Sequence, residues 1–142
     1  MLLNECWYYC SNQQKNELCS KATSIVSYLI MKTALIFGSS GLIGKKILNI
    51  IIQNKSYSKV KIFVRALPEN NNSKVEIIKT DFNNLEKHRD SIVGNVCFFC
   101  IGTTKKDTPD NDDYRRVEYN IPINVARIAK ENLIESFIYV SS

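Results

Sequence analysis

The sequence predicts an α/β fold in which helices cover both faces of a doubly wound parallel sheet. Three observations predict it. Short apolar runs alternate along the chain with longer segments whose apolar residues recur at helical spacing. Of the five glycines, Gly38, Gly41 and Gly44 lie where the first such run leads into the first helical segment. The chain has 142 residues, 44% of them hydrophobic, which is enough for one domain with a buried core.

The predicted elements follow one another from residue 33 onward. The first apolar run is short enough for a buried strand, and the helix after it carries Ile43, Ile47, Ile50 and Ile51 on one face. In chain order we expect a strand at 33–37, a helix at 42–54, strands at 59–64 and 74–78, a helix at 83–91, a strand at 95–101, a helix at 111–131 and a strand at 136–141.

Turn and capping residues set the boundaries of these elements. Pro68 and the asparagines after it mark the loop that follows the second strand, and the acids at 110–113 suit the start of a helix. Pro122 lies inside the predicted helix 111–131 and should kink it or shift its start. Right-handed crossovers then predict the strand order 3-2-1-4-5, with the carboxyl ends of strands 1 and 4 beside a ligand.

The glycine-rich turn has the form of a dinucleotide-phosphate site. Gly38 would permit a tight turn out of the strand, Gly41 would let the backbone approach a pyrophosphate, and Gly44 would let helix and strand pack closely. The helix that follows offers free amides and a positive dipole end. An ordinary structural turn is the alternative. The candidate cofactor-binding residues of this turn are Gly38, Ser39, Ser40, Gly41, Leu42, Ile43 and Gly44.

Charge and cysteine content narrow the class of protein. The net charge of +5 comes from basic residues that are interleaved with acids, so we expect no nucleic-acid partner. The five cysteines fit no disulfide framework, and Cys97 and Cys100 lie on a predicted buried strand, where they should act as small core residues. We expect no metal site and no membrane span. Because no secretory signal is present, we expect an intracellular, cytoplasmic protein.

Both ends of the chain differ from what the fold requires. Residues 1–30 are polar and lack sustained periodicity, so they form an appended segment, and Met31 is expected to be the natural start. Residues 31–142 would form the cofactor-binding domain. We expect this domain to be truncated after its fifth strand, because the helix and strands that would complete a substrate pocket are missing.

Several motifs, taken in order, resemble those of the atypical short-chain dehydrogenase/reductases. They are residues 38–44, 64–65, 80–82, 100–104, 114–119 and 139–142. The resemblance covers residues 31–142 and is closest to the Tat-interacting oxidoreductase-like branch. It implies an NAD(P)-binding Rossmann domain whose glycine turn holds the pyrophosphate.

The resemblance also implies roles for residues at the ends of the other strands. Arg65 closes strand 2, where an acid would favour NAD(H), and its planar guanidinium matches a 2′-phosphate, so NADP(H) is favoured over NAD(H). An exposed arginine without that role is the alternative. Asp81 and Phe82 would lie beside the adenine, although Asp81 suits a helix N-cap almost as well. Gly102 and Thr103 would approach the cofactor's ribose.

Catalysis is expected at the carboxyl end of strand 5. In the family a serine there polarises a substrate carbonyl, and a Tyr-x-x-x-Lys pair follows it. Ser141 and Ser142 stand at the serine's position, and the expected tyrosine and lysine lie beyond the chain. Matches at residues 28–32 and 57–61 fall at the wrong end of the sheet. His88, the only histidine, belongs to a polar segment and should be solvated.

Three functions follow from these expectations. In the first, the parent protein is an NADPH-dependent oxidoreductase that transfers hydride to a small carbonyl substrate, with this chain inactive alone. In the second, it is a non-catalytic NADP(H)-sensing regulator of a protein partner. In the third, the chain is an inactive fragment. Binding of NADPH, and a downstream tyrosine and lysine, would separate them.

Overall fold

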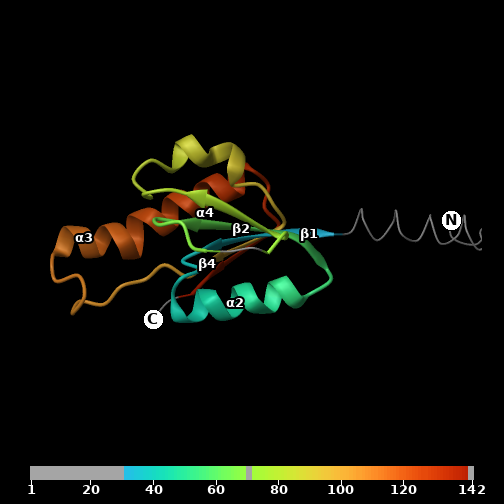
Figure 1. The fold of residues 1–142 in the computed structure, drawn as a ribbon. Coiled ribbons are helices and arrows are strands. Elements are labelled where there is room, and N and C mark those ends of the chain that lie inside the picture. Colours follow the sequence, from blue (N-terminus) through green and yellow to red (C-terminus); the bar gives the residue numbers. More distant parts are fainter. Residues whose placement is uncertain (1–30, 70–71, 141–142) are drawn as a thin grey trace, which may run out of the picture. The chain divides into compact units, whose positions relative to one another are not determined.

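The computed structural model describes residues 31–69 and 72–140 (Figure 1). The chain divides into two compact units, Met1–Met31 and Lys32–Ser142, and the second contains the fold described below. The segment 1–30 and the candidate catalytic residues Ser141 and Ser142 lie outside the described residues. The expectations about them stay untested.

A five-stranded parallel sheet with the strand order β3-β2-β1-β4-β5 forms the centre of this unit. This order confirms the predicted one. In chain order the elements are β1 (Lys32–Phe37), α2 (Leu42–Gln53), β2 (Tyr57–Val64), β3 (Val75–Lys79), η1 (Leu85–Ser91), β4 (Val96–Phe99), α3 (Asn111–Arg115), η2 (Arg116–Asn120), α4 (Ile121–Glu131) and β5 (Ser136–Tyr139).

Helices cover both faces of the sheet, as Figure 1 shows with α2 on one side and α4 on the other. Alternate residues of β1 point to opposite faces, so Leu35 and Phe37 pack toward α4 while Ala34 and Ile36 pack toward α2. Both cores are fully buried at β1, the central strand. The fold is therefore α/β and doubly wound, as the alternation of apolar runs predicted.

Aromatic rings line up across the α4 face near the carboxyl edge of the sheet. The parallel register places Phe37 beside Phe63 on one side and beside Phe99 on the other. The ring centroids of Phe37 and Phe63 are 4.2 Å apart, and those of Phe99 and Tyr139 are 5.8 Å apart. Such pairs add about 1 kcal/mol each to the stabilisation from burial. This row packs along the edge where the carboxyl ends of the strands meet.

Several of the predicted elements differ from the structure in type or in bounds; among them, β2 begins at Tyr57 and β5 ends at Tyr139. The segment predicted as a helix at 83–91 is a 3₁₀ helix, η1, and the predicted strand 95–101 ends at Phe99. The predicted helix 111–131 is interrupted by η2, a π-helical segment, and α4 begins next to Pro122. Proline lacks an amide hydrogen and fits the first turn of α4, and the backbone stays helical from η2 into α4.

The buried face of α2 is narrower than the sequence pattern indicated. Gly44 and Ile51 are buried, but Ile43 and Ile50 are 47% and 65% exposed. The helix faces the sheet with residues spaced by about one turn, and the isoleucines at 43 and 50 lie on its edges. This part of the prediction was wrong because periodicity gives the direction of a buried face and not its width.

The two cysteines of the Cys-x-x-Cys pair have different surroundings. Cys97 is fully buried on β4, where burial raises the pKa of its thiol to about 12. Cys100 lies one residue beyond β4, is half-buried, and has a thiol pKa that burial also raises. Cys97 is a core residue, as predicted, whereas the prediction that Cys100 lies within the strand was wrong.

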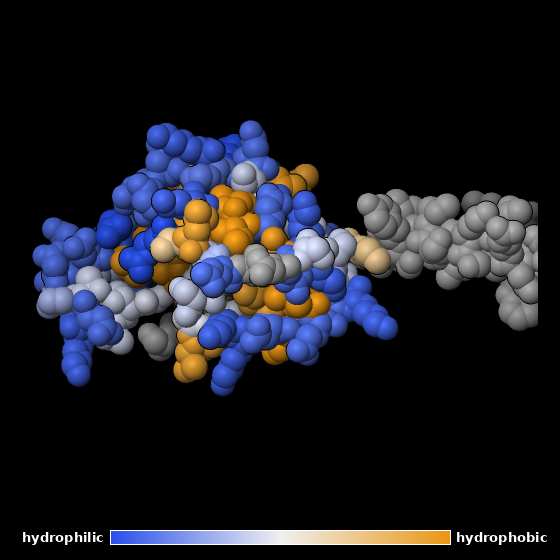
Figure 2. Space-filling view, in the orientation of Figure 1, coloured by the Kyte–Doolittle hydropathy of each residue, from blue (hydrophilic) through white to orange (hydrophobic). Residues whose placement is uncertain are grey.

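The surface in view mixes apolar and polar residues. Figure 2 shows hydrophobic residues across the middle of this face, with hydrophilic ones on either side. Single exposed apolar side chains, such as Leu42 and Leu133, are common on proteins of this kind. Within the described ranges, no helix combines the length and the apolar character needed to cross a bilayer.

Candidate cofactor site

A cavity of about 560 Å³ lies at the carboxyl edge of the sheet. Turns that follow β1, β2, β3 and β4 contribute to it, as expected for a parallel sheet, where ligands bind beyond the carboxyl ends of the strands. The predicted residues in its lining are Gly38, Ser40, Gly41, Arg65, Asp81, Phe82, Gly102 and Thr103. Residues predicted separately from distant parts of the chain therefore share one cavity.

The three glycines of the first turn have different surroundings. Gly38 has φ +85°, and a Cβ there would lie 2.8 Å from the carbonyl of Cys100. A Cβ at Gly44 would lie 2.1 Å from the carbonyl oxygen of Gly38. At Gly41 the nearest atom is that same oxygen at 3.4 Å. Gly38 and Gly44 are thus required by packing, whereas the lack of a side chain at Gly41 leaves open space beside the cavity.

The amino end of α2 carries no side-chain cap. Its N-cap residue, Gly41, has no side chain to accept a hydrogen bond, and no acidic residue lies in the first turn. Helix amides in the first turn have no partner within the helix. Leu42 and Ile43, predicted as cofactor-binding residues, direct no side chain into either large cavity, and Leu42 is 78% exposed. Their backbone amides, in the first turn of α2, are the groups that would face a phosphate.

Arg65 is the first residue after β2 and is exposed. It lines the cavity just described and also a second one, of about 500 Å³, between α2 and the loop after β2. Within residues 31–69 and 72–140, its guanidinium has no hydrogen-bonding or ion-pair partner. Its positive charge is therefore available to an anion.

The turn after β3 presents Asp81 and Phe82 in different ways. The Asp81 carboxylate accepts hydrogen bonds from the backbone amide and side-chain amide of Asn83, and the backbone bond is the main reason that its pKa is lowered. The N-cap of η1 is Asn84, so Asp81 does not cap that helix. Phe82 has φ 64° and packs its ring near that of Phe37. The exposed carboxylate at this turn can accept from a ligand.

The loop after β4 is held by a residue that the sequence analysis did not single out. Glu118, in η2, accepts a hydrogen bond from the backbone amide of Thr103, with 2.5 Å between the nitrogen and Oε1. The hydroxyls of Thr103 and Thr108 lie 2.7 Å apart. On the other side, the hydroxyl of Tyr139 donates to the carbonyl oxygen of Glu118 at 3.4 Å. Glu118 therefore links the ends of β4 and β5.

No sequence pattern identified Glu118 because its partner lies 15 residues earlier in the chain. The one available signal was the tyrosine-rich segment at 114–119, which contains it. A π-helical turn inserts an extra residue and redirects side chains, and such turns are frequent at functional sites. Burial raises the pKa of the Tyr139 hydroxyl, with a smaller contribution from Glu118, so this hydroxyl stays protonated as a donor.

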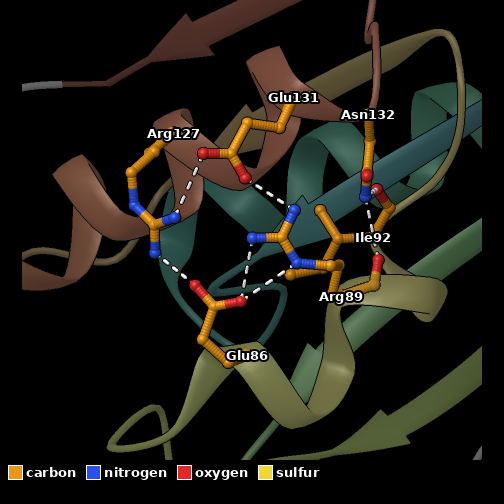
Figure 3. A network of polar contacts seen from close by, with 6 residues as sticks. All are labelled: Glu86, Arg89, Ile92, Arg127, Glu131 and Asn132. Carbon is orange, nitrogen blue, oxygen red and sulfur yellow. Dashed lines mark hydrogen bonds and ion pairs between the residues drawn. The ribbon is translucent and has the colours of Figure 1, made fainter.

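An ion-pair network joins η1 to α4 (Figure 3). Both elements lie on the face of the sheet that α4 covers. Glu86 contacts both Arg89 and Arg127, and Glu131 contacts the same two arginines, with 2.6 Å between Arg89 Nη1 and Glu131. The side-chain amide of Asn132 donates to the carbonyl oxygens of Arg89 and Ile92. These contacts fix η1, which follows directly after the Asp81 turn.

Two other predictions can be placed. His88 is half-buried in η1 and its backbone carbonyl accepts from Ile92, so it is less exposed than expected. In the part of the chain that the structure describes, no three of the His, Cys, Asp and Glu side chains are grouped as metal ligands. The lining of the 560 Å³ cavity combines backbone groups and hydroxyls with the exposed guanidiniums of Arg65 and Arg116 and the exposed carboxylates of Asp81 and Asp107.

Curated relatives share this part of the chain. The mitochondrial protein FMP52 of Debaryomyces hansenii is 32% identical over 113 residues, which are 78% of this chain and 50% of that protein. The chain therefore spans about half the length of the curated relatives it matches. This relative and other FMP52 proteins are named as mitochondrial, which contradicts the expected cytoplasmic location. The expectation was wrong because a missing secretory signal excludes only the secretory route.

Solved structures share the fold. The UDP-N-acetylglucosamine 4-epimerase of Methanobrevibacter ruminantium M1, in complex with UDP-N-acetylmuramic acid, has a TM-score of 0.68 and 20% identity over 79% of this chain and 38% of that one. A mutant uronate dehydrogenase of Agrobacterium tumefaciens, complexed with NAD, has a TM-score of 0.66 and 12% identity over 79% and 41%. A sequence model of one family matches residues 35–142. The chain belongs to the 3-beta hydroxysteroid dehydrogenase/isomerase family.

Proposed function

We propose that this chain is the NADP(H)-binding Rossmann domain of a short-chain dehydrogenase/reductase-like oxidoreductase, and that the whole protein transfers hydride to a small carbonyl substrate. One observation carries the proposal. The 560 Å³ cavity collects the glycine turn, Arg65, the Asp81 turn and the Gly102–Thr103 loop at one edge of the sheet. A dinucleotide needs such a row of phosphate, ribose and adenine contacts across the strand ends.

The glycine turn fits the pyrophosphate. The uncapped amides at the start of α2 would donate to phosphate oxygens, and the positive end of the helix dipole would favour their charge. Gly41 leaves the space that a phosphate would enter, since a Cβ there meets only one atom, at 3.4 Å. Gly38, Ser39, Ser40 and Gly44 would shape the turn, and Leu42 and Ile43 would contribute their amides.

The end of β2 supports NADP(H) over NAD(H). An NAD site places a carboxylate there to accept from the ribose 2′-hydroxyl. Here the position is occupied by Arg65, and no acid occurs from residue 59 to residue 67. A guanidinium donates paired hydrogen bonds to a phosphate, so it matches a 2′-phosphate. Asp81 would accept from the adenine amino group, with Phe82 beside it, and Gly102 and Thr103 would approach the second ribose.

Most of the residues that bind the substrate would come from the part of the whole protein that this chain does not include. The cofactor would supply the hydride, and Ser141 or Ser142 would polarise the substrate carbonyl from the end of β5. The naming of the FMP52 relatives supports a mitochondrial location for the protein. The resemblance of residues 31–142 favours the Tat-interacting oxidoreductase-like branch within the wider group.

Cofactor titration of the full chain tests the proposal. The variant Arg65→Asp should weaken NADPH binding by at least about tenfold and leave NADH binding within about threefold, because only NADPH carries the 2′-phosphate. Binding is followed by the fluorescence of the reduced nicotinamide. Arg115→Asp is the matched control, because Arg115 is exposed, contacts the Tyr119 ring and lines neither cavity. Equal losses for NADPH and NADH, or no binding by the unaltered chain, would refute the proposal.

A further inference from the structure

Two guanidinium groups line the 560 Å³ cavity, and they have different surroundings. That of Arg65 has no polar partner among the described residues, whereas that of Arg116 has two. Nη1 of Arg116 donates to Oδ1 of Asn83 at 3.0 Å, and its Nε lies 3.4 Å from Oδ1 of Asp113. A free guanidinium is available to a ligand, while one held by acceptors of the protein orients those acceptors. The two arginines therefore have different roles.

We propose that Arg116 is a positioning residue for the adenine of the cofactor. Acting through Asn83, it orients the Asp81 carboxylate that accepts from the adenine amino group. The inference rests on the proposed function and adds a residue that acts through another side chain. Because NADPH and NADH carry the same adenine, Arg116 affects both dinucleotides alike, in contrast to Arg65.

The turn after β3 has an unusual backbone. Phe82 has φ 64°, a left-handed conformation that a bulky residue rarely adopts. Within the turn, the backbone amide of Phe82 donates to the hydroxyl of Thr80 at 3.1 Å, and that of Asn83 donates to Asp81 at 3.0 Å. Both contacts join residues only two apart in the chain. Arg116 adds a contact from 33 residues further along, which ties this turn to η2.

The side chain of Asn83 connects Arg116 to Asp81. Its oxygen accepts from Arg116, and its nitrogen donates to Oδ2 of Asp81 at 3.3 Å. Because the guanidinium holds the amide oxygen, the amide nitrogen is directed toward the carboxylate. Each oxygen of Asp81 thus receives one hydrogen bond from Asn83 and keeps a lone pair for a second donor. The carboxylate is fixed in orientation and still able to accept from an amino group in the cavity.

The segment η2 contacts both walls of the cavity. Arg116, its first residue, contacts the turn after β3, and Glu118, two residues later, contacts the loop after β4. Residues two apart on a helix do not face the same side, so one short segment can reach two walls. Asp113, on the preceding α3, holds the guanidinium from outside the turn. Arg116 therefore supports the β3 wall as Glu118 supports the β4 wall.

Two reduced dinucleotides that differ only in the base test the inference on the full chain. Reduced nicotinamide hypoxanthine dinucleotide phosphate has a carbonyl oxygen where NADPH has the adenine amino group, so that position cannot donate to Asp81. The unaltered chain should bind NADPH about tenfold more tightly than this analogue. Arg116→Met, which keeps an apolar stem, should reduce the preference to about twofold and weaken NADPH and NADH binding equally, about fivefold. Nicotinamide fluorescence follows binding, and a ratio of affinities does not depend on the fraction of folded chain.

Matched variants separate positioning from charge. Arg115→Met removes the adjacent guanidinium, which is exposed and lines neither large cavity, so it should keep the preference for adenine. Arg116→Lys keeps a donor for the Asn83 oxygen and should restore most of the preference. Asn83→Leu breaks the same connection, so adding Arg116→Met to it should cause no further loss.

The outcomes separate this inference from the proposed function. If Arg116→Met keeps the preference for adenine, or if its effect adds to that of Asn83→Leu, the inference is overturned and the proposed function stands. If Arg116→Met weakens NADPH binding far more than NADH binding, Arg116 contacts the 2′-phosphate and the inference is again overturned. An unaltered chain that binds NADPH and its hypoxanthine analogue equally also overturns it, because Asp81 then reads no amino group. If the unaltered chain binds no dinucleotide, the proposed function and the inference both fail.

Discussion

The two ends of the main cavity are built in different ways. At the glycine end, residues 38–44 are consecutive, and their backbone forms the turn, the start of α2 and the space beside Gly41. At the β4 end, the Gly102–Thr103 loop is held by Glu118, which belongs to η2. The first end depends on local backbone conformation. The second depends on side chains that meet only when the sheet and helices have packed.

This difference predicts which kind of substitution destabilises each end of the cavity. A change at the glycine end acts on the backbone itself, because Gly38 and Gly44 lie in contact with carbonyl groups. A change at the β4 end removes a hydrogen bond and leaves a donor without an acceptor. The expected losses therefore differ in size, and the following variants measure them from the largest to the smallest.

Gly44→Ala should give the largest loss of stability, about 3 kcal/mol. Alanine favours a helix by about 1 kcal/mol over glycine. That gain is outweighed because the new Cβ would lie 2.1 Å from the carbonyl oxygen of Gly38, and a backbone atom cannot rotate away. Urea unfolding measures the change in the free energy of unfolding.

Gly41→Ala provides the matched control at the same end of the cavity. Its Cβ would meet only one atom, at 3.4 Å, so stability should change by less than about 1 kcal/mol. If a phosphate lies against Gly41, this variant should nevertheless bind NADPH more weakly. If Gly41→Ala and Gly44→Ala lower the free energy of unfolding equally, contact with the Gly38 carbonyl oxygen does not determine the stability of this end of the cavity.

Glu118→Ala should give an intermediate loss at the β4 end, about 1 to 2 kcal/mol. The backbone amide of Thr103 would lose its acceptor, and the linked segment is partly buried. Glu118→Gln keeps a carbonyl oxygen at that position, so it should lose less than half as much. The measurement is again urea unfolding, together with NADPH affinity, which should fall for the alanine variant. A glutamine variant as unstable as the alanine variant would show that charge, and not the hydrogen bond, holds this loop.

The network between η1 and α4 should give the smallest effect, because its side chains are exposed. Arg127→Met removes contacts to Glu86 and Glu131. Hydrogen bonds from Arg127 and Arg89 hold the pKa of Glu86 below its ordinary value of 4.5, and the same arginines lower the pKa of Glu131. The stabilisation is therefore present above about pH 4.5, and is lost as the pH falls through the lowered pKa values.

Unfolding at pH 7 and at pH 3, in low and high salt, measures this effect. Arg127→Met should be less stable than the unaltered chain at pH 7 in low salt and nearly equal to it at pH 3. Lys130→Met is the control, because Lys130 is an exposed cation on the same helix with no ion pair among the described residues. A difference for Arg127→Met that persists at pH 3 would assign its role to packing of the side chain and not to charge.

Much of the first half of the chain could be predicted because its signals are local. The strand, the turn and the helix around Gly38 and Gly44 all lie within one stretch of sequence, and the strand order follows from the handedness of crossovers. The exposure of Ile43 and Ile50 was missed, because the width of a buried face depends on what packs against it. Similarly, the π-helical segment η2 could not be read from the pattern of residues 111–131.

By itself, the sequence determined the α/β class, the sheet order, the glycine turn and the position of Arg65 at the end of β2, since each follows from hydrophobic period, glycine conformation or chain handedness. Only the tertiary structure decided that Glu118 holds the Thr103 loop and that Arg116 contacts Asn83. The physical reason is that these contacts join residues far apart in the chain. Their geometry is fixed by the packing of helices on the sheet, which no local pattern encodes.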